Sequence, residues 1–211
     1  QNFSQVTNPP IDSLRERYVM SLKTRFGNLA NILDTEDSRE RVLVLESPVL
    51  TGSDWQRLRA HFGRQAAEID CTFDADGGPE QLRAAIARIR NEAEQAVRMG
   101  QSELFLTDEH VSEDRVAIAG VLAAAAVHTH LVRRGLRSYA SINVRSAECL
   151  DTHYYAVLIG VGATTVNAYL AEAAIADRHA RGLFGALSLP QCLANHRKAV
   201  EEGLLKIMSK M

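Results

Sequence analysis

Residues 67–108, which read AEIDCTFDADGGPEQLRAAIARIRNEAEQAVRMGQSELFLTD, decide the fold class of this chain. The short apolar stretches at 67–74 and 102–108 are typical of buried strands. Between them, Pro79 suits the first turn of a helix and Gly100 suits its end. One apolar stripe with helical spacing joins Leu82, Ile86, Ile89, Ala93 and Val97. The segment therefore predicts a strand, a crossover helix and a second, parallel strand.

The same alternation continues on both sides of this unit. Apolar runs are separated by breakers such as Pro48 and Gly135. We expect a strand at 41–47, a helix at 53–62, a helix at 115–134 and a strand at 138–146. Ser53 and Gln56 have the spacing of a capping box at the start of the first of these helices.

The remainder of the chain extends the pattern. Residues 154–160 (YYAVLIG) fit a strand by composition, but a helix there, a short strand at 163–166 and a helix to Arg181 preserve the alternation. The last expected elements are a helix at 189–203, capped by Ser188, and a strand at 204–208. Four to five short strands alternating with helices predict an α/β fold, with a parallel sheet flanked by helices in an open three-layer arrangement.

Composition narrows the class of protein. The 211 residues carry a formal net charge of −2, so nothing draws the chain to nucleic acid or an anionic membrane. Cys71, Cys149 and Cys192 are odd in number, far apart and without a CxxC pair, so neither a zinc site nor a disulfide framework is predicted. Reduced thiols, with no signal peptide or membrane-spanning run, predict a cytoplasmic location.

Two motifs could hold a ligand. His128 and His130 lie on different sides of the expected helix, so a shared metal would need His153 to converge through tertiary folding. Residues 160–165 (GVGATT) look like a dinucleotide-binding turn but lack its third glycine, which favours a helix stop with close packing. We therefore predict no metal site and no nucleotide loop.

Polar residues 107–110 (TDEH) come where the third strand of the expected sheet ends. Ligand sites of parallel α/β sheets form at the carboxyl ends of the strands. One hypothesis is therefore an autonomous small-ligand-binding module that uses the strand ends near Asp108 and Arg145. This hypothesis requires a concave pocket at that edge.

Two cysteines are candidate nucleophiles. Cys71 lies inside an expected strand, where it is typical of a small buried hydrophobe. Cys149 and His153 stand at i and i+4, but a nucleophile also needs activation and an oxyanion site, and neither is evident. The residues alone therefore predict no catalytic constellation in this chain.

Five stretches carry a resemblance to a known family. They are QVTNPPIDSLRERYVMSLKTRFGN (5–28), VLVLESPVL (42–50), HTHLVRRGLRS (128–138), THYYAVLIGVGATTVNAYLA (152–171) and EEGLLKIMSKM (201–211). In order and across nearly the whole chain, they resemble the large subunit of glutamate synthase. Three sites depart from the pattern that the family commonly shows: Thr129 stands for His, Thr107-Asp108-Glu109 for Ser-Asp-Arg, and Ala168 for Pro.

The resemblance implies a piece of a larger enzyme. Residues 1–203 would be its central linking domain, without that domain's N-terminal part, and 204–211 the start of the FMN-binding barrel. The parent would convert glutamine, 2-oxoglutarate and reductant into two glutamates. The central domain would connect the glutaminase and FMN domains and help shape the ammonia path, without catalysing a step itself.

The resemblance also implies cofactors and partners, all in the parent. These are FMN and a 3Fe-4S cluster, with electrons from ferredoxin or from NADPH through a small NADPH-oxidising subunit. We expect no cofactor or metal in the chain itself. Lys206, Ser209 and Lys210 are the positions at which flavin or substrate contacts of the parent barrel would begin.

Overall fold

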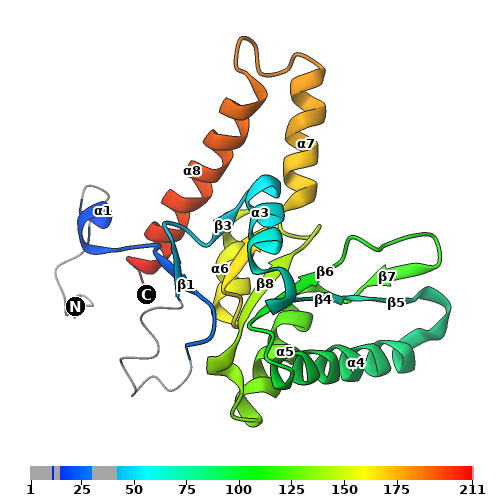
Figure 1. Cartoon of the computed structure of the whole chain (residues 1–211). Helices are drawn as coiled ribbons and strands as arrows, with labels where there is room; N and C mark the ends of the chain where they lie inside the picture. Colours follow the sequence, from blue (N-terminus) through cyan, green and yellow to red (C-terminus); the bar gives the residue numbers. More distant parts are fainter. Residues whose placement is uncertain (1–10, 12–14, 30–41, 211) are drawn as a thin grey trace, which may run out of the picture.

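The computed structural model describes residues 11, 15–29 and 42–210, and its centre is a five-stranded parallel sheet (Figure 1). In spatial order the strands are β3 (Val49–Leu50), β9 (Thr165–Asn167), β8 (Ser141–Arg145), β6 (Glu103–Thr107) and β4 (Ala66–Asp70). All four pairings between neighbours are parallel. The predicted α/β fold with a parallel sheet is confirmed.

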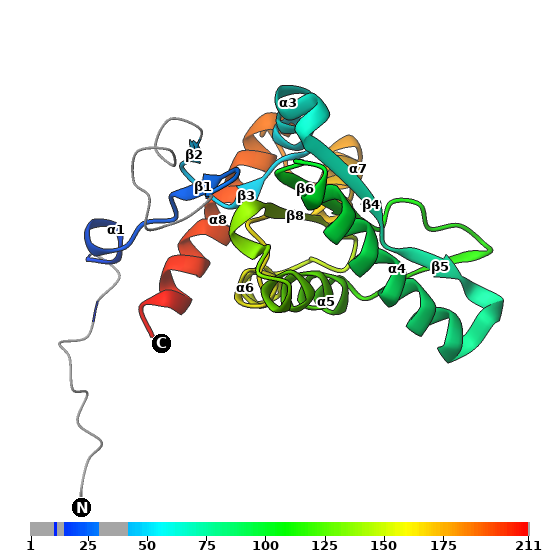
Figure 2. The same ribbon diagram turned by 60° about the horizontal axis from the view of Figure 1, so that its bottom comes forward.

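Helices cover both faces of the sheet. Three of them join successive neighbouring strands and lie together on one face: α4 (Gly78–Arg98), α5 (Gly120–Arg133) and α6 (Thr152–Gly160) (Figure 2). A crossover between parallel strands is right-handed, and steps taken in one direction therefore place their helices on one side. The opposite face carries α3 (Gly52–Phe62), which completes the three layers.

Each face of the sheet has its own core because side chains alternate along a strand. Leu104 and Leu106 of β6 join the larger core beneath α4, α5 and α6. Phe105 points the other way, and its ring meets Trp55 of α3 edge-on at a centroid distance of 4.8 Å. A second, smaller core is thus formed by Phe26, Leu50, Trp55, Leu58 and Phe105.

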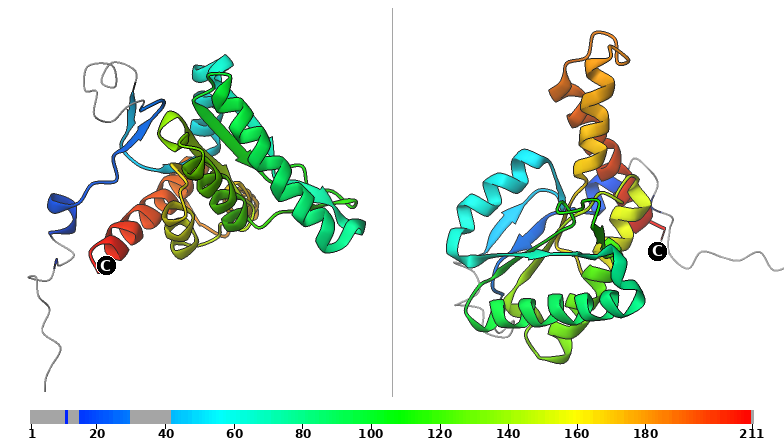
Figure 3. Two further views of the ribbon diagram at one scale, coloured as in Figure 1. Left: turned by 90° about the horizontal axis from the view of Figure 1, so that it is seen from below. Right: turned by 90° about the vertical axis from the view of Figure 1, so that its right-hand side faces the viewer.

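The C-terminal part is a helical hairpin that extends away from the sheet (Figure 3). It consists of α7 (Tyr169–Ala180) and α8 (Leu189–Met208). The predicted strand at 204–208 is wrong, because α8 continues through Gly203 to Met208. A Cβ atom on Gly203 would lie 2.5 Å from Thr152 Cγ2, so this glycine permits close packing of α8 on α6 and does not end the helix.

The predicted strand at 41–47 is also misplaced. Residue 41 lies outside the described residues, and Leu43–Leu45 form β2, which pairs antiparallel with β1 (Thr24–Phe26) outside the main sheet. The strand that enters the parallel sheet is β3, which follows Pro48 and pairs with β9. Both segments have strand-like composition, and only their tertiary partners distinguish them.

Two further boundaries differ from expectation. The stretch at 67–74 breaks at Cys71, so that β4 is followed by a separate strand, β5 (Thr72–Asp74). The expected helix at 115–134 begins late, because β7 (Arg115–Ala117) pairs antiparallel with β5. The remaining short elements are α1 (Glu16–Val19), η1 (Gly63–Gln65), η2 (Ala75–Gly77) and η3 (Arg137–Tyr139). Across the parts of the chain that the structure describes, no helix is both long and apolar enough to span a bilayer.

The start of α3 offers a direct test of helix capping. Thr51, not Ser53, is the cap: its Oγ1 accepts a hydrogen bond from the Asp54 amide at 3.2 Å, and the Asp54 carboxylate accepts one from the Thr51 amide. We expect Thr51→Ala to lower the free energy of unfolding by about 1 kcal/mol. Ser53→Ala, the matched control, should have a much smaller effect in urea denaturation. Equal losses in both variants would contradict this assignment.

Candidate functional site

The carboxyl edge of the parallel sheet is the first place to look for a site. Asp108 follows β6 and is buried there. Its carboxylate accepts hydrogen bonds from Ser146 Oγ at 3.1 Å and from the Ala147 amide at 2.9 Å, and the Tyr169 hydroxyl also bonds to it. Burial raises the pKa of Asp108, and these donors partly offset that effect. Asp108 therefore fixes the loop that follows β8.

Arg145, at the end of β8, lies beside this carboxylate. Its Nη2 pairs with Glu109 Oε1 at 2.7 Å. The guanidinium carbon lies 5.8 Å from the ring centroid of Trp55 and 5.2 Å from that of Tyr169. Both separations fit cation–π contacts, which explains how Nε and Nη1 are buried without a hydrogen-bond acceptor among the described residues. Arg145 thus joins α3, β8 and α7.

The same packing closes the edge of the sheet. The cavity that Asp108, Arg145 and Ser146 help to line has a volume of about 10 Å³, enough for about one water molecule. Sequence reasoning brought Asp108 and Arg145 together correctly, but the cavity that they line is too small for the ligand that a ligand-binding module requires. The hypothesis of an autonomous module at this edge is not supported.

The three histidines do not converge. His128 Nδ1 accepts a hydrogen bond from Arg137 Nε at 3.0 Å, whereas His130 Nε2 lies 2.6 Å from Glu94 Oε2. His153 lies in the first turn of α6. Burial lowers the pKa of His128, and the adjacent guanidinium lowers it further. Both effects favour the neutral ring, whose Nδ1 can accept the hydrogen bond from Arg137. Among the described residues no group of three or more histidine, cysteine or acidic side chains could hold a metal ion.

The cysteines and the glycine motif have structural surroundings. Cys71, Cys149 and Cys192 are buried and unbridged. Burial raises the pKa of the Cys71 thiol to about 12 and also raises that of Cys149, so both are thiols at neutral pH. Gly162 has φ of 117°, and a Cβ there would lie 2.3 Å from His128 Nδ1. The motif at 160–165 is therefore a closely packed turn, as predicted.

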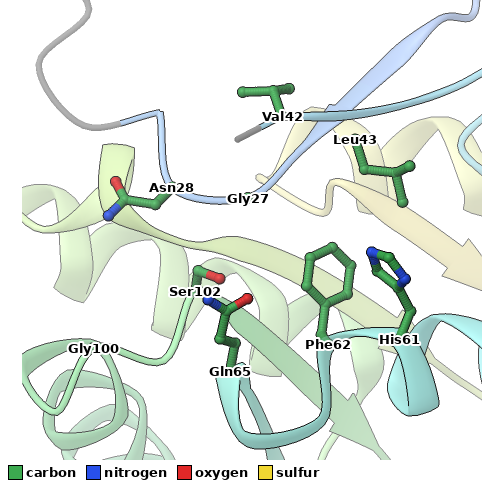
Figure 4. A pocket seen from close by; sticks show the side chains of 9 residues that line it. All are labelled: Gly27, Asn28, Val42, Leu43, His61, Phe62, Gln65, Gly100 and Ser102. Atoms are coloured by element: carbon green, nitrogen blue, oxygen red, sulfur yellow. The ribbon is translucent and has the colours of Figure 1, made fainter. Parts of the chain in front are cut away.

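A larger cavity lies at the amino edge of the sheet, with a volume of about 550 Å³ (Figure 4). Its lining residues are Gly27, Asn28, Val42, Leu43, His61, Phe62, Gln65, Gly100 and Ser102. His61 is the one histidine among these nine residues, and its ring packs edge-on against Phe62. No carboxylate is among these nine residues, and a histidine without a carboxylate partner in the same cavity does not form a catalytic constellation.

Sequence reasoning missed the most perturbed carboxylate, Glu103 of β6. It is 0% exposed, its Oε2 accepts a hydrogen bond from Asn143 Nδ2 at 2.9 Å, and its Oε1 has no partner among the described residues. Thr165 Oγ1 in turn donates to Asn143 Oδ1 at 2.7 Å, which extends the polar row across three strands. Burial raises the pKa of Glu103 to about 8. The one signal in the sequence was a charged residue inside an apolar strand.

The residues expected to begin the barrel contacts lie at the end of α8. Ser209 Oγ donates to Glu16 Oε1 at 3.0 Å and to the Lys206 carbonyl at 2.7 Å. Lys206 and Lys210 are exposed. The C-terminus of a helix presents carbonyl groups and negative potential, so these cations complement the helix. Their role toward flavin or substrate stays a prediction.

Comparison with known proteins places the chain in a family. It matches the model described as the glutamate synthase central domain over residues 1–211. It is 64% identical over 211 residues to the glutamate synthase (NADPH) large chain of Azospirillum brasilense, covering 100% of this chain and 14% of that protein.

More distant relatives are matched along the whole chain as well. The ferredoxin-dependent chloroplastic glutamate synthase of Spinacia oleracea is 39% identical over 223 residues, with 100% of this chain and 14% of that protein covered. The glutamate synthase (NADH) of Saccharomyces cerevisiae is 35% identical over 222 residues, with 100% and 10% covered. The chain therefore spans a small fraction of the curated relatives it matches. On these findings it belongs to the glutamate synthase family and corresponds to its central domain.

Proposed function

We propose that these residues act as a linking domain within a longer glutamate synthase large chain and catalyse no step themselves. The observation that carries this proposal is the closed carboxyl edge of the parallel sheet. Many α/β enzymes bind ligands at the carboxyl edge of the sheet. In this domain Asp108, hydrogen-bonded to the loop after β8, and Arg145, packed against Tyr169, fill that edge around a cavity of about 10 Å³. A domain filled in this way supports a positioning role.

The reaction itself belongs to the proposed parent. That protein would release ammonia from glutamine, deliver it to 2-oxoglutarate and reduce the product to glutamate with electrons from FMN. The printed names of the relatives specify NADPH, NADH or ferredoxin for those proteins.

The cysteines and lysines of this chain do not fit the binding of the 3Fe-4S cluster or of FMN. A 3Fe-4S cluster needs cysteine thiolates that converge, whereas the three cysteines here are separately buried and two have raised pKa values. An FMN phosphate favours a helix N-terminus, whereas Lys206 and Lys210 lie near the end of α8. We therefore assign FMN and the cluster to other parts of the parent.

The proposed boundary between the central domain and the FMN-binding barrel lies between residues 203 and 204. The helix α8 crosses it without a break, and Leu204 is buried in the larger core. If the barrel of the parent begins here, it begins on a helix that is anchored in the central domain. The contribution of this domain to the ammonia path is likewise a proposal.

The purified 211-residue chain provides the test. After incubation with FMN and gel filtration, we expect no flavin fluorescence to remain with the protein. Lys206 and Lys210, where flavin contacts were expected, lie at the C-terminal end of α8, whereas an FMN phosphate favours a helix N-terminus. We also expect no glutamine hydrolysis and no glutamate formation. The full-length parent, assayed in parallel, is the positive control. Stoichiometric retention of FMN by the 211-residue chain would refute the assignment.

A further inference from the structure

An open groove with a volume of about 560 Å³ lies between the N-terminal segment 21–25, the end of α6 and the end of α8. Its apolar lining includes Leu22, Ala156, Ile159, Leu204, Ile207 and Met208. Leu204 and Ile159 belong to the larger core or pack on it, so the floor of the groove is continuous with the interior. A groove of this size and character in a folded domain indicates a contact surface.

The charges along the groove have one sign. Lys23, Arg25 and Arg137 line it, and no carboxylate is among its lining residues. Lys23 reaches Glu46 at 3.5 Å, but both of these side chains are largely exposed and their pairing is weak in water. The groove therefore complements a negatively charged group.

Arg137 makes this complementarity specific. Each of its three side-chain nitrogens donates a hydrogen bond to an uncharged acceptor. Nε donates to His128 Nδ1 at 3.0 Å, Nη1 to the Ala140 carbonyl at 2.6 Å, and Nη2 to the Gly162 carbonyl at 2.9 Å. No ion pair to Arg137 is present within the described part of the chain. Burial lowers its pKa, which shows that the charged form is held at a cost. A carboxylate entering the groove would offset that cost.

Apolar surface continues past the end of the groove. Met208 is 42% exposed, although it lies at the groove beside Ile207. Tyr18 and Val19 of α1 are also exposed, and α1 is held against the end of α8 by the Ser209–Glu16 hydrogen bond. The apolar region is therefore broader than a small molecule needs, which favours a polypeptide occupant.

We propose that this groove receives an apolar polypeptide segment that carries one aspartate or glutamate, with the carboxylate paired to Arg137. The segment belongs to a part of the large chain outside these 211 residues, so the inference rests on the proposed function. The chain covers only 14% of its Azospirillum brasilense relative. A tethered segment is present at high effective concentration, so modest contacts suffice to hold it in the groove.

Thiol labelling measures whether the groove is covered. Met208→Cys places a reactive thiol at the groove, and Leu183→Cys places one at the far turn of the α7–α8 hairpin, where Leu183 is 59% exposed. The described native cysteines are buried, so their background reaction with a maleimide is slow. In the full-length large chain we expect Cys at 208 to react at least about tenfold more slowly than in the 211-residue chain. Cys at 183 should react equally in both.

A pair of opposite charges tests the carboxylate. Ile207→Glu and Ile207→Lys remove the same apolar contact from the groove but differ in sign. In the full-length chain that carries Met208→Cys, the Glu variant should restore fast labelling, whereas the Lys variant should retain most of the protection. Circular dichroism of each 211-residue variant confirms that it is folded. Equal effects of the Glu and Lys variants on labelling would overturn the proposal that the segment carries a carboxylate.

The other outcomes also decide the matter. Fast labelling at position 208 in the full-length chain would overturn the proposal that a segment docks in the groove. The proposed function would still stand if the 211-residue chain retained no flavin. Protection of the 211-residue chain that grows with its own concentration would identify a second copy as occupant. Protection lost on dialysis would identify a small anion. Each of these two results would refute the tethered segment.

Discussion

Gly162→Ala should lower the free energy of unfolding of this chain by about 3–5 kcal/mol. Two costs combine at this position. The backbone φ of 117° is one that residues with a Cβ rarely adopt, and the added methyl would lie 2.3 Å from His128 Nδ1 and 2.4 Å from its Cγ. His128 cannot move freely, because it accepts a hydrogen bond from Arg137, which also holds the Gly162 carbonyl.

Gly160 supplies the matched control within the same turn. It is the last residue of α6, and a Cβ there would meet nothing within 4 Å. Gly160→Ala should leave stability unchanged or raise it by up to about 1 kcal/mol, since alanine favours helix. Urea denaturation followed by circular dichroism compares the two variants. A loss below about 1 kcal/mol for Gly162→Ala would refute the packing account.

The same pair reports on the linking role in the full-length parent. If the central domain holds the ammonia path in place, its loosening by Gly162→Ala should raise the ratio of free ammonia released to glutamate formed. Gly160→Ala should leave this ratio unchanged. An unchanged ratio in a demonstrably destabilised Gly162→Ala protein would argue against the proposed coupling.

Glu103→Gln should flatten the dependence of stability on pH. Burial raises the pKa of Glu103 to about 8 from its ordinary value of 4.5. Between these two values the unfolded chain has lost the proton that the folded chain retains, so stability falls as pH rises. The loss is complete above about pH 8 and amounts to roughly 5 kcal/mol. Glutamine keeps the size of the side chain and cannot ionise.

The measurement is urea denaturation of both proteins from about pH 5 to about pH 9. At the alkaline end the Gln variant should be more stable than the unsubstituted chain by several kcal/mol, and at the acid end the two should be similar. Glu113→Gln, at an exposed position, serves as the control and should show the same dependence of stability on pH as the unsubstituted chain. A parallel offset of the Glu103→Gln curve at every pH would show that this carboxyl does not cause the dependence.

The local pattern of the sequence predicted most of the parallel sheet, because strand and helix have different periods. The stripe from Leu82 to Val97, with Pro79 at its start and Gly100 at its end, predicted α4 (Gly78–Arg98). The segment after His153 was correctly assigned as helix, strand and helix, since parallel neighbours require crossovers. These predictions depend on residues that are close in sequence.

The errors arose where distant residues decide the structure. Gly203 was interpreted as a helix end, but its lack of a side chain serves contact with Thr152, and Val200 and Leu204 continue the buried stripe past it. Composition also favoured 41–47 over Val49–Leu50 as the first strand of the sheet. The choice depends on pairing with β9, more than a hundred residues away.

The candidate site divides in the same way. The position of Asp108 and Arg145 at one edge followed from topology alone, but the filling of that edge depends on Trp55 and Tyr169. Glu103 was overlooked because its strand context predicts burial but does not show that its carboxyl group meets Asn143 instead of a basic side chain. Burial and pairing of a charged side chain are properties of the assembled fold.

The position of β3 at the far edge of the sheet has a consequence for synthesis of the chain. Leu50 and Asn167, which share a hydrogen bond, are separated by 117 residues, whereas β4, β6, β8 and β9 add in order. At ribosomal rates of 5–20 residues per second, β3 waits roughly 6–23 s for its partner. During that interval the backbone of β3 lacks the strand with which it pairs in the sheet. Chaperone contact with the nascent chain should therefore centre on this early segment and end once β9 has emerged.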